Sequence, residues 1–287
     1  MIRYVSLCIY TLINMKKYSS KLLTAFFAFS LLTFAGCSKD DNEQEGPKVD
    51  VVFTALTSSG NLQTYNANNL SSTLNSKNIT GLQAGEMILA IDYRPATGQL
   101  YGLGSSSRIY TIDMNGIATA VGSTSFSPAL SGNVAGFDFN PTVDRIRVVT
   151  STGQNLRLNP ETGAVQVTDG SINGVTGASI SSVAYTNSTA GATSTVLFDI
   201  DAAANKLYKQ DPPNDGKLVE VGNLGLTTTD TDSSFDISAD GIAIATVNSG
   251  TSSVLYQVNL ENGSTTKLGT FSGTIMGLAI PSPTTSK

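Results

Sequence analysis

Residues 88–122 read ILAIDYRPATGQLYGLGSSSRIYTIDMNGIATAVG, and residues 134–165 read VAGFDFNPTVDRIRVVTSTGQNLRLNPETGAV. The two stretches are copies of one unit, because Asp92 matches Asp138 and Pro95 matches Pro141. Within each copy, short runs of alternating apolar and polar residues are separated by turn residues, a pattern typical of half-buried strands. The two stretches therefore predict a repeating β-structure.

Weaker copies follow at residues 182–208 and 235–258, and a fragment at residues 276–280 matches only the opening strand. One position recurs in every copy, at Asp92, Asp138, Ala184, Asp236 and Ala279. The intervals between these positions are 46, 46, 52 and 43 residues. Four short strands in about 40–50 residues are typical of a propeller blade.

The chain starts, at residues 51–65, with the part of a copy that the fragment at 276–280 lacks. If the two ends pair, the ring closes and leaves no open sheet edge between first and last blade. Four full copies and one split copy thus predict an all-β fold, a five-bladed β-propeller closed by its N- and C-terminal strands. A β-sandwich or an open β array is the alternative, because short alternating strands alone do not determine topology.

Several phrases of the sequence are similar to one bacterial family. They are GLQAGE (81–86), IDYRPATGQLY (91–101), FSPALSG (126–132), GFDFNPTVDRIRVVTSTGQNLRLNPETG (136–163) and DPPNDG (211–216). The chain resembles the domain-of-unknown-function family DUF4394 over about residues 50–281. The resemblance implies an exported, propeller-like protein, and it brings no activity and no catalytic residues.

Residues 1–36 are expected to be a signal peptide, and Met15 starts a complete signal by itself. Three lysines precede Leu22–Gly36, a 15-residue apolar stretch that is shorter than the roughly 20 residues of a membrane-spanning helix. The tetrad FAGC at 34–37 resembles a bacterial lipobox, which implies that Cys37 is lipidated. An ordinary signal peptide followed by a chance cysteine is the alternative.

Residues 37–49 are expected to form a lipidated, flexible tether, because they are polar and poor in apolar residues. Lys39, Asp40 and Asp41 resemble the surface-export signal of Bacteroidota lipoproteins. We therefore expect a lipid-anchored outer-membrane protein exposed at the cell surface, with the periplasmic face as the alternative. The propeller is expected over 50–282 and a short tail over 283–287.

Composition excludes several classes of function. The chain has no histidine, and its two cysteines, Cys8 and Cys37, both lie near the N-terminus, so catalytic triads with histidine and thiolate metal sites are excluded from the body. Residues 1–37 hold four of the 17 bases and no acid, which leaves 13 bases against 22 acids and a net charge of −9. An acidic body argues against nucleic acid as a partner. No metal or cofactor is predicted, and a monomer is expected.

Two sets of charged residues are candidates for a site. Asp92, Asp138 and Asp236 recur at one blade position, where they could form a ring of carboxylates near the central tunnel or bond backbone N–H groups as structural caps. The arginines of the two best-kept copies could line a face that grips an acidic ligand, or could pair with acids within the fold. These arginines are Arg94, Arg145, Arg147 and Arg157.

Three hypotheses for the function follow. The first is a non-enzymatic surface module that binds a glycan, a protein or an envelope component on one propeller face. The second is a carboxylate-dependent glycoside hydrolase or lyase that acts on extracellular polysaccharide. The third is a purely structural envelope protein.

Overall fold

The computed structural model describes residues 48–132, 134–226 and 232–282. The predicted signal peptide, Cys37, the Lys39-Asp40-Asp41 motif and the tail at 283–287 lie outside the described residues. All the strands that the structure describes belong to one compact unit, residues 44–287. Within the described part, no helix is long and apolar enough to span a membrane.

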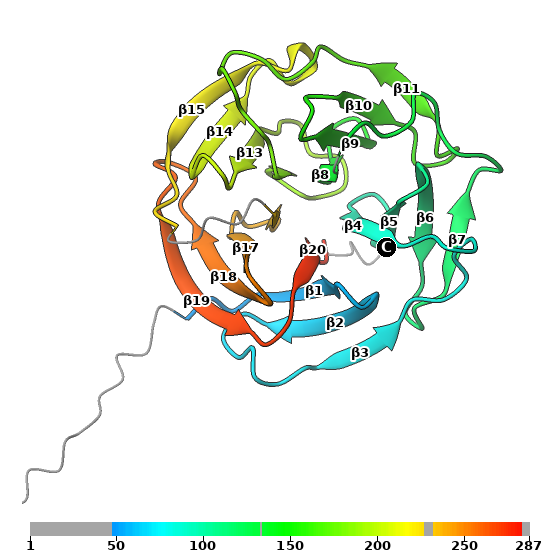
Figure 1. The fold of residues 1–287 in the computed structure, drawn as a ribbon, viewed down its shortest axis with the longest axis horizontal. Helices are drawn as coiled ribbons and strands as arrows, with labels where there is room; N and C mark the ends of the chain where they lie inside the picture. The colour runs from blue at the N-terminus through cyan, green and yellow to red at the C-terminus, as the bar shows by residue number, and fades with distance from the viewer. Residues whose placement is uncertain (1–47, 133, 227–231, 283–287) are drawn as a thin grey trace, which may run out of the picture. The chain divides into compact units, whose positions relative to one another are not determined.

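The strands form five four-stranded antiparallel sheets, which are the blades of a five-bladed propeller (Figure 1). Blade 1 consists of β20 (Ile275–Ala279), β1 (Val52–Thr57), β2 (Asn61–Asn66) and β3 (Asn75–Asn78). Blade 2 consists of β4 (Ile88–Arg94), β5 (Gln99–Gly104), β6 (Arg108–Ile112) and β7 (Ala118–Val121). Blade 3 consists of β8 (Val134–Asn140), β9 (Arg145–Thr150), β10 (Asn155–Leu158) and β11 (Val165–Thr168). Blade 4 consists of β12 (Ser182–Tyr185), β13 (Leu197–Asp201), β14 (Lys206–Gln210) and β15 (Leu218–Asn223). Blade 5 consists of β16 (Ser233–Ile237), β17 (Ala243–Ser249), β18 (Ser252–Val258) and β19 (Thr265–Phe271).

The two ends of the propeller chain close the ring within blade 1. Strand β20 pairs antiparallel with β1, with Ala279 opposite Thr54 and Gly277 opposite Leu56. Neighbouring inner strands contact one another around the whole circle, from β4 through β8, β12 and β16 to β20 and back to β4. The predicted fold class is therefore confirmed, including the pairing of the terminal strands.

The repeat spacing follows from the turns that join each inner strand to the next strand of its blade. The short hairpins of blades 2 and 3 place Gly98 and Asp144 in the left-handed region, at φ 71° and 50°. Such a φ favours glycine and is tolerated by aspartate, which explains why the two residues align in the repeat. In blade 4 the equivalent connection runs over residues 186–196, and it accounts for the longest repeat interval.

The core lies between blades rather than in one central mass. Between blades 2 and 3, for example, Tyr101 of β5 packs edge-on against Phe139 of β8, with ring centroids 5.1 Å apart. Burying each such large apolar side chain contributes about 1.5–3 kcal/mol. Because every blade packs on two neighbours, the inner strands are held at fixed positions around the central axis.

Candidate functional site

A cavity of about 510 Å³ lies at the centre of the propeller, where the five inner strands begin. Every blade contributes to its wall, so the cavity forms a funnel, which we call the central funnel. One lining residue per blade immediately precedes the matched repeat position, namely Ile91, Phe137, Val183, Phe235 and Leu278. The repeat therefore builds the funnel with approximate five-fold symmetry.

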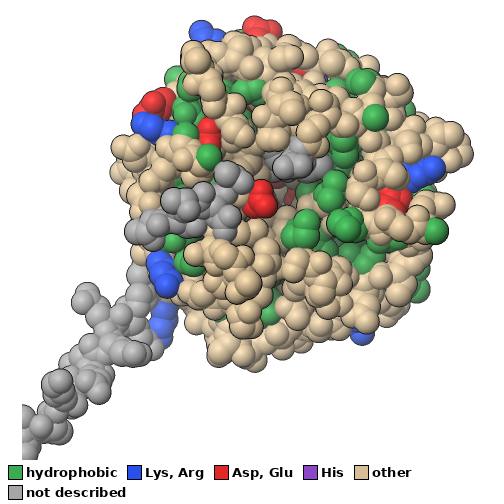
Figure 2. All heavy atoms as spheres, in the orientation of Figure 1, with side chains coloured by type: hydrophobic (Ala, Val, Ile, Leu, Met, Phe, Trp, Pro, Cys, Tyr) green, Lys and Arg blue, Asp and Glu red, His purple; other side chains and the backbone are tan. Residues whose placement is uncertain are grey.

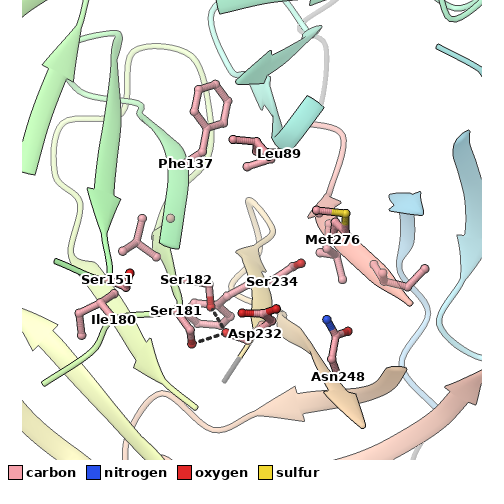
Figure 3. Close-up of a pocket in the computed structure, with 18 of the residues that line it drawn as sticks. Leu89, Phe137, Ser151, Ile180, Ser181, Ser182, Asp232, Ser234, Asn248 and Met276 are labelled. Atoms are coloured by element: carbon pink, nitrogen blue, oxygen red, sulfur yellow. Dashed lines mark hydrogen bonds between the residues drawn. The ribbon is translucent and has the colours of Figure 1, made fainter. Parts of the chain in front are cut away.

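The wall of the central funnel differs between its sides (Figure 3). Leu89 of β4 and Met276 of β20 present apolar side chains to the cavity, whereas Ser181 and Ser182 lie across from them. The hydroxyl of Ser233 forms hydrogen bonds with the hydroxyls of Ser181 (2.6 Å) and Ser182 (2.7 Å). One side of the funnel is thus apolar and the other is rich in hydroxyl groups.

Charge in the central funnel is sparse and negative. Among the described lining residues, the exposed Asp232 is the single charged side chain, and none is a lysine or arginine. Figure 2 shows a propeller face that is hollowed at its centre, with apolar side chains beside the hollow and the visible lysines and arginines toward the rim. This distribution favours an uncharged ligand over an anionic one.

The three repeated carboxylates lie together on the inner strands, and each links its own blade to the next. Asp92, Asp138 and Asp236 are each 4% exposed, and they offer oxygen atoms within 4.8 Å of one another. The interblade bonds run from Phe139 N to Asp92 Oδ2 (2.8 Å), from Tyr185 N to Asp138 Oδ1 (3.1 Å) and from Ile280 N to Asp236 Oδ2 (2.6 Å). We call these three residues the carboxylate cluster.

The two alanines of the repeat explain the remaining junctions of the ring. Blades 1 and 4 carry Ala279 and Ala184 at the matched position, so they offer no carboxyl group to the blade that follows. In that following blade, the corresponding backbone N–H bonds instead to the aspartate of its own inner strand. These bonds run from Tyr93 N to Asp92 Oδ1 (2.7 Å) and from Ile237 N to Asp236 Oδ1 (2.6 Å). Hydroxyl groups join the blades there instead, between Thr54 Oγ1 and Tyr93 Oη (3.0 Å) and in the serine group of blades 4 and 5.

Burial and mutual repulsion raise the pKa values of the carboxylate cluster. Burial, followed by the negative charge of Asp236, raises the pKa of Asp92 well above its ordinary value. Burial and the charges of both neighbours do the same to the pKa of Asp138, and burial raises the pKa of Asp236 to about 7. Two unit charges 4.8 Å apart repel by about 3 kcal/mol at an effective dielectric constant of ~20, so full ionisation is strongly opposed.

The spacing of the carboxylate cluster would also suit a small cation, because three oxygen ligands could converge on one point. Five of its six oxygens, however, already accept a backbone N–H. Each of these oxygens keeps a second lone pair, so a cation would have to share the oxygens with the backbone N–H groups. The backbone bonds give the three carboxyl groups a structural role without a metal, and we assign none to the cluster.

Arg94, a candidate for the ligand face, is bound within the junction of blades 2 and 3. Its guanidinium makes two bonds to Asp144, from Nε to Oδ1 (2.9 Å) and from Nη2 to Oδ2 (2.5 Å). Nη1 lies 2.5 Å from Glu161 Oε1. The hydrogen bonds to Asp144 raise the pKa of Arg94 further, so it stays charged and paired.

Arg147 is bound within the junction of blades 3 and 4. Its side chain is 1% exposed, and Nη1 donates to Asp169 Oδ2 (2.6 Å) and Asn155 Oδ1 (2.7 Å). Nη2 donates to Asn214 Oδ1 (2.9 Å), and Nε donates to Tyr185 Oη (3.2 Å). The structure thus surrounds this arginine with acceptors of the protein itself.

The other two arginines lie nearby and are also engaged. Arg157 forms a two-pronged pair with Asp169, at 2.7 and 2.8 Å. Arg145 is half-buried and bonds to Gln166 and to the carbonyl oxygen of Asp144 (2.8 Å). None of the four arginines is among the described residues that line the central funnel.

Sequence reasoning missed Glu86, which the GLQAGE phrase contains. Its Oε2 accepts a hydrogen bond from Tyr110 Oη (2.5 Å), and its Oε1 accepts bonds from the N–H and hydroxyl of Ser106. Although burial opposes ionisation, these hydrogen bonds from Ser106 and Tyr110 lower the pKa of Glu86. A Cβ at Gly104 would lie 2.1 Å from Oε1, so the phrase and this glycine form one structural unit.

Sequence analysis also gave no indication that Asp199 on β13 is a buried carboxyl group. Its side chain is fully buried, and neither oxygen has a hydrogen-bond partner among the described residues. Burial raises the pKa of Asp199 well above its ordinary value, and Arg147 opposes this only in part. Because the position follows no repeat pattern, no signal in the sequence points to it.

Comparison with known proteins gives a family and no activity. Residues 61–279 match the family model described as "Domain of unknown function (DUF4394)". No curated protein matches the chain. A protein of unknown function from Bacteroides caccae, solved by crystallography, is similar in structure at 12% sequence identity and a TM-score of 0.44, over 76% of this chain and 72% of that one.

Proposed function

This chain belongs to the DUF4394 family of domains of unknown function, and we propose that it is a non-enzymatic binding module whose central funnel takes up a neutral saccharide unit. The observation that carries the proposal is the lining of the funnel, which is apolar on one side and hydroxylated on the other, with no described lysine or arginine. A sugar ring offers the same combination, since it carries hydroxyl groups at its edge and C–H groups on its faces.

Size and electrostatics support this class of ligand. A cavity of about 510 Å³ falls within the roughly 300–1,000 Å³ of small-molecule sites. Phosphates, nucleotides and acidic sugars would meet Asp232 at the wall and an acidic protein body around it. The ligand is therefore expected to be neutral, and acidic saccharides are expected to bind weakly.

The carboxylate cluster argues for binding without hydrolysis. A glycosidase needs two carboxyl groups about 5–10 Å apart that face a cleft and are free to exchange protons with the substrate. Here the three carboxyl groups are 4% exposed and do not line the central funnel as described. A glycoside hydrolase or lyase therefore stays the alternative function, and the carboxylate cluster does not support it.

We expect the full chain to bind at least one member of a panel of neutral oligosaccharides, measured by isothermal titration calorimetry. Met276→Arg places a charge on the apolar side of the central funnel and should weaken that binding at least tenfold, a change of about 1.4 kcal/mol. Met114→Arg is the matched control, because Met114 is 90% exposed and does not line the funnel.

The same panel tests the alternative, because reducing ends released during incubation are measured in parallel with the heat of binding. Steady release of reducing ends would show that the protein is a hydrolase and not a non-enzymatic binding module. Uniform failure to bind neutral saccharides, or equal affinities for the Met276→Arg and Met114→Arg proteins, would remove the funnel from the proposal.

We propose further that a lipid on Cys37 anchors this module in the outer membrane, with Lys39-Asp40-Asp41 directing it to the cell surface. On expression in a bacterial host, Cys37→Ala should shift the protein from the membrane fraction to the soluble fraction, because several acyl chains are needed for durable anchoring. Cys8→Ala is the matched control, since Cys8 lies within the predicted signal peptide. A Cys37→Ala protein that stays with the membranes would refute lipid anchoring at this residue.

A further inference from the structure

The members of the carboxylate cluster differ in how many backbone donors they accept. Asp92 and Asp236 each use both carboxyl oxygens, one for their own strand and one for the next blade. Asp138 accepts a backbone N–H from Tyr185 through Oδ1, and no described backbone N–H is bonded to its Oδ2. The Oδ2 of Asp138 is therefore the oxygen of the cluster that can carry a proton without losing a backbone bond.

Among the residues that the structure describes, no cation neutralises the carboxylate cluster. Arg94, the one basic residue within the five inner strands, is bound to Asp144 and Glu161. Arg147 stands opposite Asp138 in the register of β8 and β9, but its guanidinium is bound to Asp169, Asn155, Asn214 and Tyr185. The other titratable groups on the inner strands and on the strands paired with β4, β8 and β16 are Arg145, which is bound to Gln166 and to the carbonyl oxygen of Asp144, and the tyrosines Tyr93, Tyr101 and Tyr185. Charge balance inside the cluster must therefore come from protons.

We propose that Asp138 carries a proton at neutral pH and shares it with Asp92 and Asp236, so that the carboxylate cluster acts as a proton-holding latch between blades. The latch joins blades 2, 3 and 4 through Asp92 and Asp138, and it joins blades 5 and 1 through Asp236. Loss of the proton at alkaline pH leaves adjacent negative charges in a buried place and loosens these junctions. Closure of the ring by this latch is separate from ligand binding in the central funnel.

Replacing each aspartate of the cluster by asparagine is expected to affect stability differently at the three positions. In Asp138→Asn, the amide oxygen still accepts the Tyr185 N–H, and the amide NH₂ replaces the shared proton as a donor to the other two carboxylates. In Asp92→Asn or Asp236→Asn, the NH₂ must face one of two backbone donors, which loses a buried hydrogen bond. These differences follow from the backbone bonds alone, so the shared proton is tested by pH: without it, the stability of Asp138→Asn would depend on pH as steeply as that of the natural protein.

Thermal unfolding of the full chain between pH 6 and pH 9 tests the latch. We expect the Tm of the natural protein to fall as the pH rises, and the Tm of Asp138→Asn to be equal or higher at pH 7 and to depend less on pH. Asp92→Asn and Asp236→Asn should lower the Tm at pH 7 by about 2–12 °C, the range expected for one lost buried bond in a domain of this size.

Two results would overturn the proposal. The first is a Tm for Asp138→Asn that falls as far as the Tm of Asp92→Asn, or that depends on pH as steeply as the Tm of the natural protein. The second is a Tm that rises on addition of Ca²⁺ or Mg²⁺ and falls with a chelator, because the cluster would then hold a cation in place of a proton. Asp199→Asn is the matched control, since it removes a buried carboxyl group outside the cluster and should leave the difference between the Asp92 and Asp138 variants unchanged.

Discussion

Replacing Arg147 by Met is expected to lower the free energy of unfolding by about 3–5 kcal/mol, because it removes one partner of a buried ion pair. The Arg147 and Asp169 side chains are 1% and 4% exposed. Asn155 and Asn214 would lose their charged donor as well, and methionine supplies volume but no hydrogen bond. Urea denaturation at pH 7, with an unchanged dependence on denaturant concentration, measures the loss.

Arg145→Met is the matched control for this prediction. Arg145 lies two residues earlier on the same strand, β9, but it is half-buried and its bonds reach Gln166 and nearby carbonyl oxygens. We expect that substitution to change the stability by no more than about 0.5 kcal/mol. If Arg147→Met left stability intact and abolished saccharide binding instead, Arg147 would belong to a ligand face, as the sequence suggested.

The architecture could be predicted from the sequence because the repeat consists of local patterns of apolar, polar and turn residues. The match between residues 88–122 and 134–165 defines the blade, and the fragment at 276–280 defines how the ring closes. Both follow from alternation and turn residues, which depend on near neighbours along the chain. The recurrence of Asp92, Asp138 and Asp236 left two interpretations open, a ring of carboxylates near the central tunnel or structural caps, and the structure places the three side chains together on the inner strands.

The partners of the charged residues could not be predicted in the same way. Asp92 bonds to Phe139 because neighbouring blades are packed with a particular offset, and nothing in the sequence states that offset. Arg147 meets Asn214, 67 residues away, for the same reason. The hydroxylated side of the central funnel escaped notice because Ser181 and Ser233 come from strand starts in different blades, where serine is also an ordinary turn residue.

The conspicuous charged residues and the residues that line the central funnel belong to two different sets. The three repeated aspartates, Arg94 and Arg147 stand out in the sequence, and each bonds to a neighbouring blade. The residues that line the central funnel are unremarkable in type, and several precede the conspicuous aspartates by one position. In a propeller, ligand specificity is therefore to be sought beside the repeated motif rather than in it.

Asp199→Leu is expected to stabilise the protein at pH 8 by about 1–3 kcal/mol, because it removes a buried carboxyl group that has no hydrogen-bond partner among the described residues. Folding raises the pKa of Asp199, so the folded chain holds a proton that the unfolded chain releases. Its contribution to stability is thus largest below the ordinary pKa of an aspartate, and it is lost as the pH rises, by at most about 1.4 kcal/mol per pH unit.

The stabilisation by Asp199→Leu should therefore grow from pH 5 to pH 8, as measured by urea denaturation at several pH values. Asp201→Leu provides the matched control, because Asp201 lies two residues along the same strand and is equally buried. Its two oxygens accept the N–H groups of Ser179 and Ala204, both at 2.8 Å, so the same change to leucine should be destabilising there. Similar losses at both positions would mean that Asp199 has a partner in solution, such as a buried water molecule, which satisfies its carboxyl group.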